Sequence, residues 1–291
     1  MPRLPEPTPV FLPKPIPPTG HPLTRALRAL LIEKRLPTTA ADTFDRLAIK
    51  VGLPYQTIAV TDPEGGLQPA RLRVRRQSAD RFFLAEVFID HAYSPPGYEI
   101  CESDTIIDVG ANIGSFTIFA ARRAKQGRVI AFEPTRQSFS LLQGNISKNR
   151  LKHVSTERAA LTDRAGPVTL HLSGLGSGHH SLNPAFAGPS RSSEDVSGLT
   201  LADAFAKHDI KTCNCLKLDC EGAEFPILES LSPNLAARIE RIALEYHTRP
   251  TAPKREQSDA LARRLLDLGF TIDIYTDVLD TNRGMLFARR A

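Results

Sequence analysis

The sequence predicts an α/β fold in which acidic residues follow buried strands at one edge of a sheet. The first observation is the segment at residues 106–117, IIDVGANIGSFT, where apolar residues surround an acid and two glycines follow. Apolar residues then recur at helical spacing, which indicates a buried strand, a tight turn and a helix that begins over the turn. The other two observations are apolar segments at 129–133 and 215–219, which also end in acids.

The turn is suited to a ligand. Gly110 and Gly114 have no Cβ, so the backbone can approach a bound group closely. The helix start adds free N–H groups and the positive end of a dipole. A dinucleotide fingerprint is not present, because Asn112 and Ser115 stand where it requires glycines, and no G-K-[ST] follows to make a P-loop.

The carboxylate of Asp108 beside this turn favours a cationic ligand. S-adenosylmethionine carries an ammonium and a sulfonium, and its own carboxylate can accept hydrogen bonds from the turn amides. Glu133 ends the second strand about 20 residues past the loop, where doubly wound folds hold ribose hydroxyls. An ordinary α/β crossover with a capping acid is the alternative, and the two motifs in this order favour the cofactor site.

Composition bounds the remaining possibilities. The chain has 291 residues, enough for one large domain with or without an extension. Its net charge of +5 and pI of about 9.1 come from dispersed arginines, so nucleic acid is not a required partner. No apolar run can span a bilayer, and prolines interrupt the N-terminus, so we expect a cytoplasmic protein without a membrane partner.

The four cysteines are expected to be thiols. Cys213, Cys215 and Cys220 do not have the spacing of a zinc site.

Three regions follow from the order of the chain. The proline-rich residues 1–22 predict an extended or disordered arm. Residues 23–79 predict an extension made of helices at 23–36 and 39–51 and of a hairpin with a turn at 62–66. Residues 80–291 form the main domain. Its expected helices are 80–93, a helix after Pro134, 199–207, 225–231 and 259–268. Its expected strands are 106–109, 129–132, 154–160, 167–172, 215–219, 239–244, 270–275 and 285–288. Residues 173–181 are predicted to be a mobile lid or binding loop, and 184–198 a surface loop.

Further candidate residues lie near the ends of these strands. Asp219, Glu221 and Glu224 surround Gly222, and three acids at one strand end argue for a site. His247 follows Glu245 at the end of the next strand. Adjacent histidines point apart on an extended chain, so His179 and His180 are not expected to share a metal.

The motifs IDVGANIGSFT, AFEP, LKLDCEGAEFPIL and ALEYH occur in this order, and together they resemble the FkbM-type S-adenosylmethionine-dependent methyltransferases. The resemblance covers about residue 80 to the C-terminus. It implies a class I methyltransferase (Rossmann-like) fold with a seven-stranded, mostly parallel sheet and helices on both faces. It also implies methylation of an oxygen, or of another heteroatom, on a small molecule or sugar.

On this hypothesis the candidate residues take separate roles. The methionine part of the cofactor is assigned to Asp108, Gly110, Asn112 and Gly114, the ribose to Glu133 and the adenine to Asp163. Asp163 has the alternative of capping a turn. The general base is Asp219 or His247, and the substrate is assigned to Tyr93, His180, Glu221 and Glu224.

Several alternatives stay open. Tyr93 lines the site or simply packs. No metal is predicted, although a divalent cation on Asp219 and Glu221 is an alternative. Two other functions are alternatives to small-molecule methylation: a non-catalytic S-adenosylmethionine-binding protein and a nucleic-acid methyltransferase. The last lacks support, because no N-P-P-Y-like tetrapeptide follows Asp219 and no basic–aromatic stripe is present.

Overall fold

The computed structural model describes residues 46–61, 68–173, 177–187, 190–248, 253–276 and 283–290. Within these ranges residues 46–50 are helical, which agrees with the second half of the helix expected at 39–51. The predictions that lie outside the described residues are the arm at 1–22, the helix at 23–36, the turn at 62–66 and the tip of the 173–181 loop. No helix among the described residues combines the length and the apolar character needed to cross a membrane.

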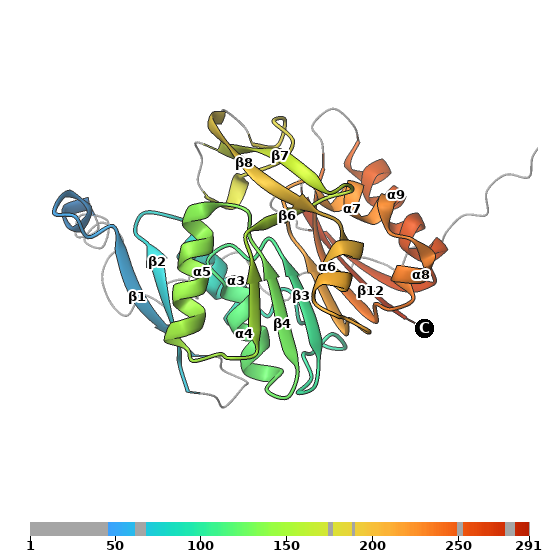
Figure 1. Cartoon of the computed structure of the whole chain (residues 1–291), viewed down its shortest axis with the longest axis horizontal. Coiled ribbons are helices and arrows are strands. Elements are labelled where there is room, and N and C mark those ends of the chain that lie inside the picture. The colour runs from blue at the N-terminus through green and yellow to red at the C-terminus, as the bar shows by residue number, and fades with distance from the viewer. Residues whose placement is uncertain are drawn as a thin grey trace, which may run out of the picture.

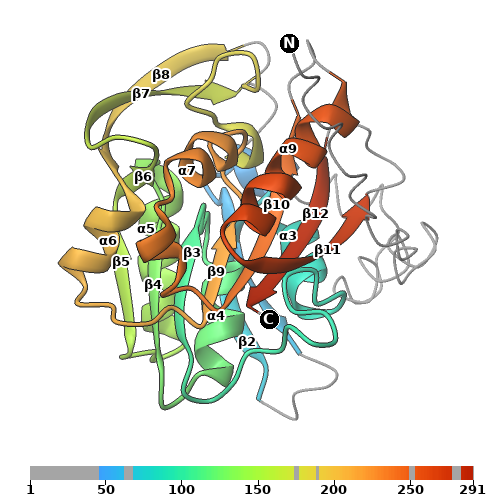
Figure 2. The same ribbon diagram turned by 90° about the vertical axis from the view of Figure 1, so that its right-hand side faces the viewer.

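A seven-stranded sheet forms the centre of the molecule, in the order β11-β12-β10-β9-β3-β4-β5. Figure 2 shows it running from β4 and β5 on one side to β11 and β12 on the other. Only β12 runs against its neighbours. The strands are β3 (Thr105–Val109), β4 (Arg128–Phe132), β5 (Val154–Glu157), β9 (Cys215–Leu218), β10 (Arg241–His247), β11 (Phe270–Thr276) and β12 (Arg283–Arg290). This arrangement confirms the predicted class I methyltransferase fold, including its mostly parallel sheet.

Helices cover both faces of the sheet, and the alternation of side chains along each strand supplies both contacts. On β3, Ile106 belongs to the same hydrophobic cluster as Phe119, while Ile107 belongs to the cluster that contains Phe205. In Figure 1 the helices α3 to α5 lie to the left of β3 and β4, and α6, α7 and α9 lie to the right. The helices are α3 (Asp80–Phe88), α4 (Ser115–Arg123), α5 (Arg136–Lys148), α6 (Leu201–Lys207), α7 (Glu224–Ser230), α8 (Pro233–Ala236) and α9 (Lys254–Asp267).

The predicted N-terminal hairpin is present as β1 (Tyr55–Val60) and β2 (Ala70–Arg75), which pair antiparallel. Leu72 and Val74 are fully buried and share a hydrophobic cluster with Phe119 of the main domain. The hairpin therefore belongs to the same core as the sheet.

Three predicted elements differ from the structure. The helix expected at 80–93 ends at Phe88, and His91 then adopts a positive φ of 50° that a helix does not allow. The strand expected at 154–160 is divided into β5 and β6 (Ala159–Leu161), which belong to different sheets.

The surface loop expected at 184–198 is wrong, because it contains most of β8 (Ser190–Leu199). This strand pairs with β7 (Gly166–Ser173) and with β6. The segment is rich in serines and acids and has few apolar residues, so no alternation of apolar and polar residues marks it as a strand. Its strand conformation depends on pairing with β7.

The sheet has a topological switch point between β3 and β9. The chain leaves β3 to build β4 and β5 on one side, and it later returns to place β9 on the other side. Ligands of open α/β sheets bind in the crevice at the carboxyl ends of strands at such a point. The small β6-β8-β7 sheet lies above this end in Figure 1. The short helix η1 (Ser177–His179) follows β7 along the chain.

Candidate functional site

A cavity of about 500 Å³ lies at the carboxyl ends of the parallel strands. Its lining comes from the glycine turn after β3, the ends of β4, β9 and β10, the small sheet and the loop after α3. Polar and charged residues that line it include Glu86, Tyr93, Asn112, Ser115, Glu133, Thr135, His179, His180, Lys217, Asp219, Glu221, Glu245, His247, Thr248 and Arg283. The cavity thus brings together most of the residues that the sequence assigned to a site.

The glycine turn depends on its two glycines for packing. Gly110 has a φ of +75°, and a Cβ there would lie 1.8 Å from the backbone oxygen of Asp219. A Cβ on Gly114, which has a φ of +93°, would lie 2.7 Å from Leu142 Cδ1. The turn is therefore packed directly against the end of β9 and against α5, and it presents residues 110–112 to the cavity.

The structure does not bring Asp108 to the cavity, which corrects the predicted direct contact with the cofactor. Its side chain is fully buried below the turn, where it accepts a hydrogen bond of 2.6 Å from Thr117 Oγ1. Lys217 Nζ lies 3.2 Å from its other oxygen. The carboxylate that the sequence assigned to a ligand is therefore paired with Lys217 of the buried strand β9.

Lys217 connects the turn to the strand ends. Its Nζ donates to the carbonyl oxygens of Val109 and Gly110, at 3.1 and 2.9 Å, and lies 3.6 Å from Asp219 Oδ2. Burial lowers the pKa of Lys217, but Asp108 and Asp219 together raise it above its usual value. Lys217 is therefore a buried cation that connects the glycine turn to Asp219.

Glu133 lies at the end of β4 and lines the cavity. Its Oε2 accepts from the Asn112 N–H at 2.9 Å, and its Oε1 accepts from the N–H and Oγ1 of Thr135 at 2.9 and 2.6 Å. Burial raises the pKa of this carboxyl, although the hydrogen bonds from Thr135 and Asn112 oppose the rise. The predicted ribose-binding acid is thus fixed beside the glycine turn.

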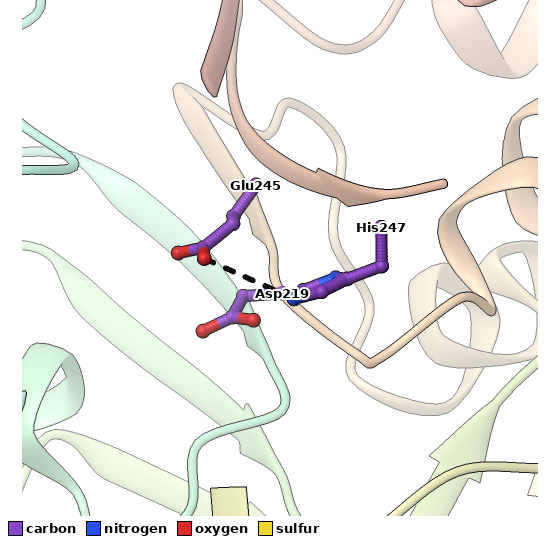
Figure 3. A group of neighbouring side chains, drawn as sticks. All are labelled: Asp219, Glu245 and His247. Carbon is purple, nitrogen blue, oxygen red and sulfur yellow. Dashed lines mark ion pairs between the residues drawn. The ribbon is translucent and has the colours of Figure 1, made fainter. Parts of the chain in front are cut away.

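The other end of the cavity holds four residues that we call the acid–imidazole cluster, namely Asp219, Glu221, Glu245 and His247. His247 Nε2 lies 3.5 Å from Glu221 Oε2 and 3.8 Å from Glu245 Oε1. Figure 3 shows the side chains of Asp219, Glu245 and His247 converging from the ends of β9 and β10. The two predicted base candidates, Asp219 and His247, are therefore neighbours.

Tyr93 joins the two carboxylates of this cluster. Its hydroxyl lies 2.8 Å from Asp219 Oδ2 and 2.8 Å from Glu245 Oε2, and its ring is buried. Burial, Asp219 and Glu245 raise the pKa of Tyr93 well above its usual value, so it stays a neutral phenol. Tyr93 lines the cavity, and its ring also packs edge-on against Phe116.

Glu224 does not line the cavity, which corrects its assignment to the substrate. It is fully buried behind His247, whose Nδ1 lies 3.2 Å from Glu224 Oε1. The backbone N–H groups of Cys220 and Gly222 donate to the same carboxylate at 2.7 and 2.8 Å. Glu224 therefore fixes the orientation of the imidazole and leaves Nε2 facing the cavity.

The carboxylates around His247 determine its charge. Burial lowers the pKa of His247, but Glu221, Glu224 and Glu245 raise it well above its usual value. Burial raises the pKa of Glu221 to about 8, against the opposing effect of His247. These carboxylates therefore favour the charged form of the His247 imidazole.

Two further candidates are placed differently from one another. His180 lines the cavity, and its Nδ1 accepts from the Ser173 N–H at 3.0 Å. Asp163 is exposed, accepts a hydrogen bond of 2.8 Å from Thr162 Oγ1 and lies outside the cavity lining.

Three residues of this site were not identified from the sequence. Lys217 was detectable in principle, because it is a charge inside an otherwise apolar strand segment. Arg75 of β2 reaches Asn112 Oδ1 at 2.9 Å and Asp80 at 2.8 Å, and Arg283 of β12 reaches Glu245 Oε1 at 3.0 Å. Asn112 and Glu245 lie 37 and 38 residues along the chain from these arginines, so no local pattern indicates the two contacts.

Comparison with curated proteins gives several relatives. The chain is 25% identical over 291 residues to the AMB antimetabolite synthetase AmbE of Pseudomonas aeruginosa, a match that covers 87% of this chain but only 13% of AmbE. It is 28% identical over 194 residues to the 31-O-demethyl-FK506 methyltransferase FkbM of Streptomyces tacrolimicus, covering 57% of this chain and 74% of that enzyme. It is 26% identical over 222 residues to the methyltransferase sdnD of Sordaria araneosa, covering 66% and 82%.

Among solved structures, a fibrillarin pre-rRNA processing protein of Methanococcus jannaschii matches 81% of this chain and 94% of its own, with 12% identity and a TM-score of 0.46. The Methyltransferase FkbM domain matches residues 108–272, which extend from the first acid of the glycine turn into β11. The chain therefore belongs to the FkbM methyltransferase family.

Proposed function

We propose that the chain transfers the methyl group of S-adenosylmethionine to a hydroxyl oxygen of a small molecule or sugar. One observation carries this proposal: a single cavity at the topological switch point joins a glycine turn and Glu133 to the acid–imidazole cluster. The first half suits a nucleoside with a charged amino-acid part, and the second half suits removal of a proton. Membership of the FkbM family supports methyl transfer as the reaction.

The cofactor part of the cavity divides into two contacts. The amides at 110–114 and the start of α4 would hold the carboxylate of the methionine part, since a helix start favours an anion. Glu133 would accept hydrogen bonds from the ribose hydroxyls. Asp108 would act from below the turn, through Lys217 and Thr117, and Asp219 would face the cationic groups of the cofactor.

The reaction is a displacement at the methyl carbon. The acceptor oxygen forms a bond to this carbon, the bond from carbon to sulfur breaks, and its electron pair stays on sulfur, which becomes a neutral thioether. The hydroxyl proton passes to the acid–imidazole cluster, either to Asp219 or to the neutral form of His247. Positioning of the two reactants supplies much of the acceleration, and proton removal contributes about 10²–10⁴-fold.

Transfer of a labelled methyl group tests the proposal. The purified chain is incubated with methyl-labelled S-adenosylmethionine and a cell extract, and label is then sought in small molecules, protein and nucleic acid. We expect label in the small-molecule fraction, and cofactor binding by calorimetry. Binding without transfer to any fraction would identify a non-catalytic binding protein, and label in nucleic acid would overturn the acceptor class.

The substitution His247→Ala tests whether the acid–imidazole cluster acts in catalysis and not in cofactor binding. It should lower turnover by about 10²-fold or more while cofactor affinity changes little, because His247 lies in the acceptor half. Asp209→Asn is the control, since Asp209 is an exposed acid that pairs with Lys211 at 2.5 Å, outside the cavity lining. An equal loss of turnover and of cofactor binding would show that His247 is structural.

A further inference from the structure

We propose that Asp219, Glu245 and His247 bind a divalent metal ion at the acceptor end of the cavity. One ligand atom from each residue lies within 4.8 Å of the other two, and this is the single group of three such residues found among the described part of the chain. The three side chains come from the ends of adjacent strands β9 and β10 (Figure 3). The inference rests on the proposed function only for its role in the reaction.

The imidazole is held as a metal ligand would be. Histidines that bind metal commonly donate their other ring N–H to a carboxylate, which fixes the tautomer and the ring orientation. Here the buried Glu224 lies 3.2 Å from Nδ1, so Nε2 points toward Glu221 and Glu245, at 3.5 and 3.8 Å. A cation on Nε2 takes the place of the imidazolium proton.

Tyr93 lies between the two carboxylates and cannot donate to both of them. Its hydroxyl has one hydrogen, yet Asp219 Oδ2 and Glu245 Oε2 both lie 2.8 Å from it. One of these oxygens therefore does not accept from Tyr93, although Glu245 is only 6% exposed. A cation between Asp219 and Glu245 would interact with both carboxylates at once.

The charges around this point also favour a cation. Lys217 is shared between Asp108 and Asp219, and Arg283 pairs with Glu245 at 3.0 Å. Negative charge is therefore in excess when His247 is neutral. The acids that contribute are Asp219, Glu224 and Glu245.

The donor set indicates the kind of ion and its role. Two carboxylates and one imidazole suit Mn²⁺, Fe²⁺ or Zn²⁺, since imidazole is a ligand of transition metals and carboxylate of harder ions. In the proposed reaction the ion would bind the acceptor oxygen and favour release of its proton to water, and Asp219 and His247 would then serve as metal ligands in place of the general base. The acceptor class would then be a hydroxyl compound that can bind a metal.

Equilibrium dialysis tests the site. The full chain is stripped with a chelator and dialysed against Mn²⁺ or Zn²⁺, and bound Mn²⁺ is also followed by electron paramagnetic resonance. We expect one ion per chain for at least one of these metals. Asp219→Asn and Glu245→Gln should each weaken binding by more than about 10-fold, and Asp209→Asn should not.

Two outcomes would overturn the metal site: no stoichiometric ion on the unchanged chain, or the same affinity in the Asp219→Asn and Glu245→Gln variants. A thermal unfolding scan of each variant shows that its chain is folded. Cofactor binding is measured separately by calorimetry in excess chelator. Binding of S-adenosylmethionine with full methyl transfer in chelator would sink the metal role and leave the proposed function intact. Metal binding without binding of S-adenosylmethionine would support the metal site and overturn the proposed function.

Discussion

At the residue scale, Gly110 links two strand ends. Its missing Cβ leaves room for the backbone oxygen of Asp219, which would otherwise lie 1.8 Å away. The sequence suggested that the glycine makes room for a ligand, but the structure shows that β9 takes this space. Gly110 therefore allows the glycine turn to pack directly against the backbone of Asp219, which belongs to the acid–imidazole cluster.

Gly110→Ala should destabilise the fold and weaken cofactor binding. The new Cβ clashes with backbone, which cannot rotate away, and the φ of +75° is strained for alanine. We expect a loss of about 2–4 kcal/mol in the free energy of unfolding, and cofactor affinity about 10-fold lower. Denaturant unfolding and calorimetry measure the two effects.

Gly144→Ala is the matched control. Gly144 lies within α5, and a Cβ there meets no atom within 4 Å. This change should stabilise the fold by up to about 1 kcal/mol, because alanine favours a helix. Similar losses in both variants would contradict the proposed packing of the turn.

At the element scale, α5 serves as a hydrogen-bonding partner for the edge of β2. Asn145 Oδ1 accepts from the Arg73 N–H at 2.6 Å, and its Nδ2 donates to the Arg73 carbonyl at 3.1 Å. One turn later, Asn149 makes the same pair of bonds to Arg71, at 3.0 and 2.7 Å. The side-chain amides thus occupy positions that a neighbouring strand would fill, which protects an open edge.

Asn145→Ala should cost more than Asn149→Ala. Asn145 is fully buried and also donates to the Ile113 carbonyl at 2.9 Å, so its loss leaves buried groups without partners. We expect a loss of about 1–3 kcal/mol in the free energy of unfolding. At Asn149 water can reach the exposed Arg71 backbone, so the loss should be smaller. Equal losses by denaturant unfolding would argue against this account.

At the scale of the whole molecule, the hairpin and the main domain form one unit. Arg75 of β2 pairs with the fully buried Asp80 at 2.8 Å and also contacts Asn112 in the glycine turn at 2.9 Å. Leu72 and Val74 add apolar area to the core shared with α4. The segment that the sequence treated as an extension therefore supports the glycine turn, which is proposed to hold the cofactor.

A chain that starts at residue 80 should unfold at a lower temperature than the full chain and bind S-adenosylmethionine more weakly. Loss of Leu72 and Val74 alone removes about 1.5–3 kcal/mol each. Arg75→Ala should fall between the two, because it leaves Asp80 buried without its cation, at a cost of about 3 kcal/mol. Equal thermal unfolding of the shortened and full chains would show that the hairpin is independent.

The sequence by itself determined the fold class, the order of the strands that end in acids, and the edge of the sheet at which those acids meet. These follow from periodicity and from the parallel arrangement, which carries strand ends to the same side. Only the tertiary structure decided which acids face the cavity. Glu133 and Asp219 face it, whereas Asp108 and Glu224 are covered by Lys217 and His247. The reason is physical: a side chain's neighbours come from strands distant in sequence, and spacing along one strand does not contain them.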